Sequence, residues 1–228
     1  VRRERLERLW KQYGDYAIAA VAVIVIAVAG FKFWQRYEMQ QRLNASSECF
    51  AARQIAASGN GPAAATAFAN LAKTAPKGYA AVSQLAEADA LYGAGNRADA
   101  LTLYKKMADQ TSSPLAEVAR IRAAWIMVDT APRTELESWL APVNVETNAW
   151  RFTAREILAY ADYRIGALGR AESEFAELAA QKDVSQTIRG RARAMADFIK
   201  AGGDKDYGSV PKPAVPAPAD NSKGQPSP

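Results

Sequence analysis

A run of sixteen residues without a charge, from Tyr16 to Phe31, is the feature of this 228-residue chain that most constrains its fold. As an α-helix the run is about 24 Å long, and extending it to Trp34 makes it about 28 Å. These lengths approach the ~30 Å hydrocarbon core of a bilayer, and aromatic residues flank both ends, as is typical of membrane interfaces. The sequence therefore predicts a transmembrane anchor over residues 16–34, preceded by a basic cytoplasmic segment over residues 1–15.

The basic residues on either side set the expected direction of this anchor. Five precede the run, at positions 2, 3, 5, 8 and 11, and three follow it closely, at positions 32, 36 and 42. This excess favours a cytoplasmic N-terminus, with the rest of the chain across the membrane. A cleaved signal peptide is the alternative, because Ala27-Val-Ala29 has the form of a cleavage site. The helical pattern continues past that site, however, and the run is longer than a usual signal-peptide core.

The anchor carries candidate contact residues of two kinds. Lys32 and Trp34 stand where a basic stem and an aromatic ring would meet the lipid headgroups. Ala20, Ala27 and Gly30 are small enough to let another membrane helix approach closely, although alanine is common throughout the chain. We therefore expect this segment to contact the lipid bilayer, and small-residue packing would add a helical partner.

Composition excludes several kinds of function. The chain has no histidine, which is the commonest general base and metal ligand, so neither catalysis nor a cofactor is expected. Residues 35–201 carry twenty basic and eighteen acidic side chains, a net charge of +2, and this is too little for nucleic-acid binding. The cluster from Arg189 to Arg193 is interpreted as a solvated helix face. The single Cys49 is expected to be a small buried contact.

Beyond the anchor the sequence is helical and repetitive. Three segments share the pattern Gly-x4-Ala-x3-aromatic-x2-large apolar, and they begin at Gly59, Gly95 and Gly166. The first two copies lie 36 residues apart and the third 71 further on, which leaves room for one more unit. Such a period is typical of stacked helical hairpins, with glycine ending one helix and alanine letting two helix axes approach. The repeated positions are therefore interpreted as core: Ala64, Phe68, Leu71, Ala100, Tyr104, Met107, Ala171, Phe175 and Leu178.

Prolines between the helical patterns complete the predicted organisation. Helices are expected over residues 15–58, 63–74, 79–94, 97–110, 114–129, 133–140, 147–166, 169–181 and 185–201, the last of them capping the stack. Residues 35–201 then form one repeat domain. Residues 202–228 hold six of the eleven prolines and are expected to be a disordered tail.

The spacing resembles the tetratricopeptide repeat family, whose small and aromatic second-helix positions match the alanines and aromatics above. The family's first-helix tryptophan and closing proline are not reproduced cleanly. The unit between residues 116 and 147 is degenerate, because Asp129-Thr-Ala-Pro132 replaces the glycine turn. The predicted fold class is all-α, with a single N-terminal transmembrane helix followed by an α-solenoid of tetratricopeptide-like hairpins and a C-terminal capping helix.

The order of anchor, four repeat-like units and tail resembles the bacterial family of ancillary SecYEG translocon subunits (YfgM-like). Three short words carry this resemblance: Trp10-Lys-Gln-Tyr-Gly-Asp15, Trp139-Leu-Ala-Pro142 and Trp150-Arg-Phe-Thr-Ala154. It implies an inner-membrane protein with a periplasmic repeat domain. The implied partners are the SecYEG translocon, a PpiD-type membrane-anchored chaperone and newly exported polypeptides. Two alternatives remain: an assembly factor for cytochrome c or envelope complexes, and a cytoplasmic-facing adaptor if the topology is reversed.

The inner surface of such a stack is lined by the first helix of each hairpin. The repeat register assigns eight residues to it, and their mixed charge and tyrosines suit the recognition of peptides or proteins. Ordinary packing or solvent exposure is the alternative for each one. The eight are Arg53, Val82, Leu85, Asp89, Tyr92, Arg120, Tyr160 and Tyr163.

Overall fold

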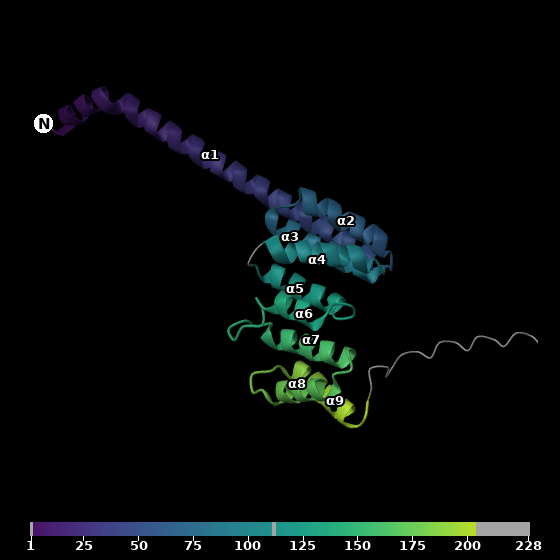
Figure 1. Cartoon of the computed structure of the whole chain (residues 1–228). Coiled ribbons are helices and arrows are strands. Elements are labelled where there is room, and N and C mark those ends of the chain that lie inside the picture. The colour runs from purple at the N-terminus through teal and green to yellow at the C-terminus, as the bar shows by residue number, and fades with distance from the viewer. Residues whose placement is uncertain (1, 111–112, 204–228) are drawn as a thin grey trace, which may run out of the picture.

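The computed structural model of the chain describes residues 2–110 and 113–203, with side chains from residue 22 onward. Within these ranges the chain forms nine α-helices and no strand, which confirms the predicted all-α class (Figure 1). The helices are α1 (Arg2–Ala57), α2 (Gly61–Thr74), α3 (Lys77–Gly93), α4 (Arg97–Gln110), α5 (Pro114–Met127), α6 (Arg133–Leu140), α7 (Arg151–Arg164), α8 (Leu168–Ala180) and α9 (Gln186–Lys200).

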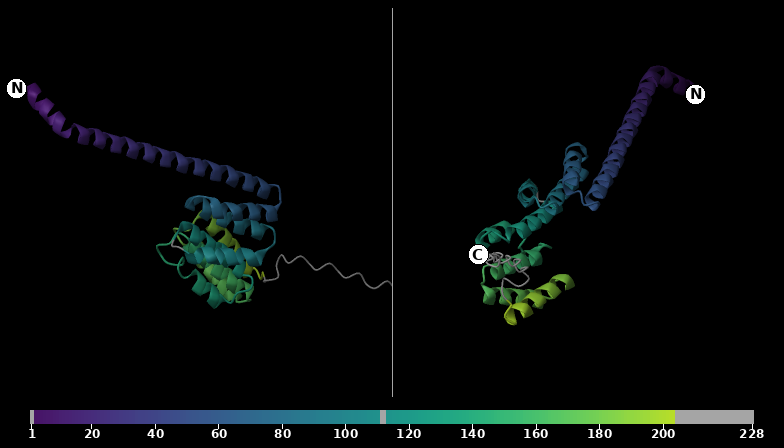
Figure 2. Two further views of the ribbon diagram at one scale, coloured as in Figure 1. Left: turned by 90° about the horizontal axis from the view of Figure 1, so that it is seen from above. Right: turned by 90° about the vertical axis from the view of Figure 1, so that its right-hand side faces the viewer.

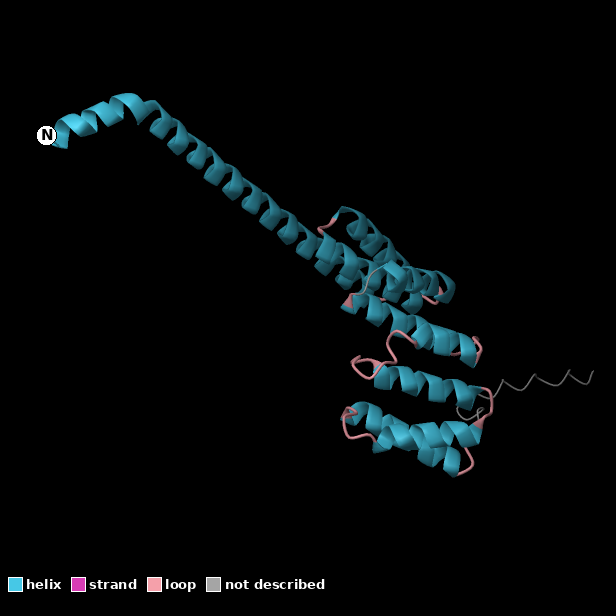
Figure 3. Cartoon of the chain, turned by 60° about the vertical axis from the view of Figure 1, so that its left-hand side comes forward, coloured by secondary structure: helices cyan, strands magenta, loops and turns pink. Residues whose placement is uncertain are grey.

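The helices form a stack of hairpins that follows the order of the chain (Figures 1 and 3). Each helix packs on the next one, and the odd-numbered helices also pack on each other, from α1 on α3 to α7 on α9. In the described part of the chain, the backbones of the even-numbered helices come close only to those of their sequence neighbours. The odd-numbered helices therefore line one face of the stack, as the first helices of repeat hairpins do. α9 occupies the odd position after the last hairpin and covers its end.

Glycine turns separate the two helices of three hairpins, as the repeat pattern predicts. Gly59, Gly95 and Gly166 adopt φ angles of 84°, 85° and 79°, a conformation that only glycine reaches at little cost. At the end of α3 the N–H of Gly95 donates to the carbonyl of Tyr92 at 3.0 Å, and the N–H of Asn96 donates to that of Leu91 at 2.9 Å. These two bonds satisfy carbonyls that the helix end leaves free.

The repeated alanines and aromatics form the core, which confirms their interpretation. Ala64, Ala100 and Ala171 are fully buried. The aromatic residues that follow them, Phe68, Tyr104 and Phe175, are at most 2% exposed, and Cys49 is buried beside Phe68. Because the alanine has only a methyl group, neighbouring helices can approach closely enough to enclose the ring one turn further on.

The third unit departs from the pattern, as its sequence indicates. α6 has eight residues, and its Leu136 and Leu140 are fully buried. The following helix was expected to begin at residue 147 but begins at Arg151. The reason is local, since the side-chain oxygen of Asn148 accepts the N–H of Trp150 at 2.7 Å and holds a turn that delays the helix.

α1 is one continuous helix that projects from the stack (Figure 2). It begins at Arg2, earlier than the expected residue 15, and its residues from 22 to 40 are exposed. In the part of the chain that the structure describes, none of the helices combines the length and the apolar character that a membrane span requires. Residues 16–21 of the predicted anchor have no described side chains, and residues 204–228 of the predicted tail lie outside the described part. Both assignments stay predictions.

Candidate functional site

The structure puts the eight residues predicted for the inner face into three kinds of surroundings. Arg53 and Tyr92 are exposed, the latter by 45% of its surface, and Val82 and Tyr160 are partly buried at the surface. Asp89 and Arg120 are half-buried and hydrogen-bonded to other side chains or to backbone. Leu85 and Tyr163 belong to the core. The eight positions are therefore not one continuous surface.

Leu85 and Tyr163 are covered by neighbouring helices. Leu85 packs in a cluster with Ala88 and Tyr104. The ring of Tyr163 lies 5.7 Å from that of Tyr160 and 6.4 Å from that of Phe198, which belongs to α9. The capping helix therefore closes over a position that the repeat register assigned to the inner face, and the side chains of Leu85 and Tyr163 are buried rather than open to a partner protein.

Arg120 joins three helices. Its guanidinium donates to the carbonyl of Trp139 at 2.9 Å and to that of Ala108 at 3.1 Å, and it lies 4.5 Å from the centre of the Trp139 ring system. The indole N–H of Trp139 donates back to the carbonyl of Arg120 at 2.9 Å. With these donors in use, Arg120 holds α4, α5 and α6 together.

Asp89 is the centre of a second junction, between α3, α4 and α5. It accepts the hydroxyl of Tyr104 at 2.5 Å and also the guanidinium of Arg122. Burial of the Tyr104 ring, together with its bond to Asp89, raises the pKa of the phenol above its ordinary value. The hydroxyl therefore stays protonated and donates a hydrogen bond to Asp89.

An apolar pocket opens further along the odd-numbered helices. Trp125 of α5 is 37% exposed, and its ring lies 6.1 Å from that of Tyr160 of α7, edge to face. With Met195 of α9 these residues line a cavity of about 280 Å³, which is large enough to hold an apolar side chain. The sequence prediction missed Trp125 and Met195. A signal for Trp125 was present, because it is an aromatic residue in the first helix of its hairpin, as Tyr92 and Tyr160 are in theirs.

A buried carboxylate, Asp162, holds the last two units together. Asp162 is fully buried and receives two bonds from Arg170, at 2.5 and 2.7 Å, as well as the guanidinium of Arg133. Arg133 also donates to Glu174 at 2.8 Å. Each buried charge therefore has charged partners, as burial requires.

The cluster from Arg189 to Arg193 is a solvated helix face in part: Arg191 and Arg193 are exposed, as expected, whereas Arg189 is half-buried. Arg189 donates to three carbonyls after the end of α8, which belong to Gln181, Lys182 and Val184. Arg191 makes two bonds of 2.7 Å to Glu156, which is 4% exposed. Both arginines fasten the capping helix to the stack.

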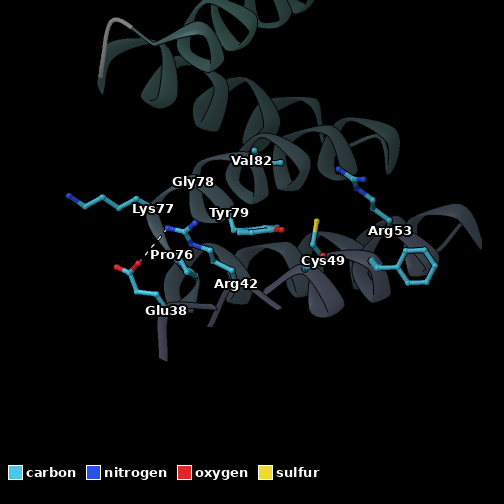
Figure 4. Close-up of a pocket in the computed structure, with 11 residues that line it drawn as sticks. Glu38, Arg42, Cys49, Arg53, Pro76, Lys77, Gly78, Tyr79 and Val82 are labelled. Atoms are coloured by element: carbon cyan, nitrogen blue, oxygen red, sulfur yellow. Dashed lines mark ion pairs between the residues drawn. The ribbon is translucent and has the colours of Figure 1, made fainter. Parts of the chain in front are cut away.

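A second opening lies at the other end of the stack, between α1 and the start of α3 (Figure 4). It has a volume of about 760 Å³, and Arg53 and Val82 from the predicted face line it. Cys49, Phe50 and Tyr79 contribute further to its walls. Two of the eight predicted residues therefore meet here, and one more, Tyr160, lines the apolar pocket.

The predicted anchor residues lie on the projecting part of α1. Ala27, Gly30, Lys32 and Trp34 are exposed, and the indole of Trp34 donates to Glu38 at 3.3 Å. The side chain of Ala20 lies outside the described residues. In the part of the chain searched, no group of three or more acidic, cysteine or histidine side chains could hold a metal ion.

This fold, with two openings along the face of its odd-numbered helices, defines the class of helical-repeat proteins that bind other proteins. The sequence model of the tetratricopeptide repeat-like domain matches residues 7–135, more than half of the chain, so the protein belongs to that family. The match begins within α1 and ends in α6, and the structure continues the hairpins to α9. No curated protein and no solved structure shows a significant match.

Proposed function

We propose that the chain is a membrane-anchored binding module that holds newly exported polypeptides beside the Sec translocon. The observation that carries this proposal is a set of accessible aromatic side chains, one on each of three successive odd-numbered helices, here called the aromatic row. Tyr92 of α3, Trp125 of α5 and Tyr160 of α7 all remain accessible or partly accessible. Aromatic side chains supply much of the binding energy at protein interfaces.

The chemistry of this row suits an unfolded polypeptide. The cavity beside Trp125 and Tyr160 accepts one large apolar side chain, and Arg97 lies over the ring of Tyr92 at 5.7 Å from its centre. An extended chain would bury single apolar side chains against these rings while its backbone keeps its hydrogen bonds with water. Such contacts need no particular sequence in the partner.

Support for the membrane anchor comes from α1. Tyr16 to Phe31 carry no charge, and Val23 to Ile26 are each at least 60% exposed. A helix that is apolar on all sides is stable when lipid or protein surrounds it. The resemblance to ancillary SecYEG subunits adds the translocon and a PpiD-type chaperone as partners, and the excess of basic residues before the run favours a periplasmic repeat domain.

Photo-cross-linking from the inner face tests the binding role. A cross-linking residue at Tyr92 or at Trp125 should capture a secretory polypeptide during export, whereas one at Thr66 or Lys73, exposed on α2, should not. Equal capture from both faces would contradict a binding role for the inner face.

The matching loss-of-function test combines Tyr92→Ala with Trp125→Ala. Capture of the same polypeptide by purified full-length protein should fall about tenfold, which corresponds to two modest interface contacts. Thr66→Ala with Lys73→Ala is the control, and both variants should keep the wild-type thermal midpoint. Purification in mild detergent should bring down SecYEG subunits with every variant, since all four substitutions lie outside the predicted anchor. Their absence from the wild-type preparation would refute the proposed location.

A further inference from the structure

The groove between α1 and α3 has walls of mixed character. The ring of Phe50 is 65% exposed beside it, and Tyr79 and Val82 face it from α3. Figure 4 shows Tyr79 and Val82 opposite the row of α1 side chains that runs from Arg42 to Arg53. Covering a large apolar ring that is exposed to water lowers the free energy, and this favours binding of a partner.

The length of the groove fits a polypeptide segment. Its α1 wall extends from Glu38 to Arg53, with lining residues about one turn apart. Fifteen residue steps along a helix cover about 22 Å. A partner helix of about four turns spans this distance, and its apolar side chains at successive turns would meet the apolar walls.

The charges around the groove are mostly positive. Arg42, Arg53 and Lys77 line it, against one carboxylate, Glu38, which pairs with Arg42 at 3.6 Å. Among the described residues, Arg53 and Lys77 have no ion-pair partner. α3 also begins here without a side-chain cap, and space around Gly78 is open, so the positive end of that helix adds to the field.

We propose that this groove binds an acidic amphipathic segment of a partner protein. The segment's apolar side chains cover Phe50, Tyr79 and Val82, and its carboxylates approach Arg53 and Lys77. The inference rests on the proposed binding role, and it adds the chemistry of the partner and a place for it distinct from the aromatic row. A lipid headgroup would satisfy the charges alone and leave the apolar walls uncovered, so a polypeptide fits the groove better.

Two synthetic peptides of fifteen residues test this proposal. Both carry leucine at positions spaced three and four apart, one with glutamate and the other with lysine at the remaining positions. Fluorescence anisotropy with the full-length protein in mild detergent should detect binding of the glutamate peptide and at least about tenfold weaker binding of the lysine peptide. Raising the salt concentration should weaken the glutamate complex. Equal binding of the two peptides overturns the proposal.

A charge reversal in the groove makes the test specific to this site. Arg53→Glu with Lys77→Glu should weaken binding of the glutamate peptide about tenfold or more. Arg193→Glu with Lys200→Glu changes the net charge equally at exposed positions of α9, and it should bind as the wild type does. Both variants should share the wild-type thermal midpoint, because all four side chains are exposed. Wild-type affinity in the groove variant overturns the proposal.

The remaining outcomes separate this inference from others. If wild-type protein binds phosphatidylglycerol vesicles and the groove variant does not, while neither binds the glutamate peptide, the groove serves lipid headgroups and the proposal fails. If the groove variant binds like wild type but Tyr92→Ala with Trp125→Ala loses secretory polypeptide, this inference fails and the proposed function stands. The inference is supported if the groove variant loses binding of the glutamate peptide while the control variant on α9 keeps it.

Discussion

The first two hairpins and the last two are built on one repeat, yet different forces stabilise them. In α1 to α4 the core consists of small and aromatic side chains such as Ala45, Ala64 and Phe68. The buried polar side chain described in this region is Ser83, whose hydroxyl has no hydrogen-bond partner. In α5 to α9 the buried polar side chains are Glu156 and Asp162, and both receive arginines.

The difference follows from the degenerate third unit. α6 has eight residues and offers less apolar surface than the other second helices. Its first residue, Arg133, extends to the carbonyl of Leu158, to Asp162 and to Glu174. One long side chain therefore contacts the two helices of the next hairpin, where packing alone would leave them less well positioned. Charge pairs of this kind specify a geometry more than they add stability.

The largest expected effect lies in the apolar region. Phe68→Ala should lower the free energy of unfolding by about 3–5 kcal/mol, because it leaves a cavity between α1 and α2. Phe50→Ala, which removes the same ring from an exposed position, should change it by no more than about 0.5 kcal/mol. Urea unfolding followed by circular dichroism measures both. A similar loss in the two variants would mean that α1 and α2 do not depend on this core.

A slightly smaller effect is expected in the charged region. Asp162→Ala should cost about 3 kcal/mol, since it leaves the guanidinium of Arg133 partly buried with one neutralising partner fewer. Asp129→Ala removes a carboxylate from an exposed pair with Arg164 and should cost less than about 1 kcal/mol. The same unfolding measurements decide the comparison. Equal costs for the two variants would show that burial of Asp162 contributes nothing.

The smallest effect concerns the junction of the two regions, at Tyr104. Its folded pKa is raised above the ordinary 10.0, so the folded state binds the proton more tightly than the unfolded state. The resulting stabilisation is fully present below pH 10 and is lost as the pH rises above it, by at most about 1.4 kcal/mol per pH unit. Tyr104→Phe should be about 1 kcal/mol less stable at pH 8, from the lost hydrogen bond, but should lose less stability between pH 10 and 11.

Thermal unfolding at each pH measures this difference. Tyr92→Phe is the matched control, because Tyr92 is an exposed tyrosine, and the pH dependence of this variant should follow the wild type. Parallel curves for Tyr104→Phe and wild type would contradict a protonated, buried phenol at this junction.

The repeat itself was predictable from sequence because its requirements are local. A left-handed turn needs glycine, and a close approach of two helices needs alanine, so Gly95 and Ala100 mark a hairpin without any knowledge of the rest. Which residues of the inner face stay accessible was harder to predict from sequence. The repeat register assigns Tyr163 to the same face as Tyr92 and Tyr160, but the capping helix covers Tyr163. The sequence does not show how much of the inner face that helix covers. One of the two arginine partners of Asp162, Arg133, lies 29 residues away in the chain, and no spacing rule links the two residues.

Because α1 is continuous, it fixes the rotation of the groove about the helix axis relative to the projecting end. Its 56 residues follow about 84 Å of helix axis, with a bend near the N-terminal end (Figure 3), and the projecting end and the wall of the groove belong to this one helix. A partner that binds the projecting end therefore also sets the direction in which the groove faces. One residue inserted between the projecting end and the groove would rotate the groove by about 100° about the helix axis. Seven inserted residues would move it about 10 Å along the axis and return it almost to its original orientation.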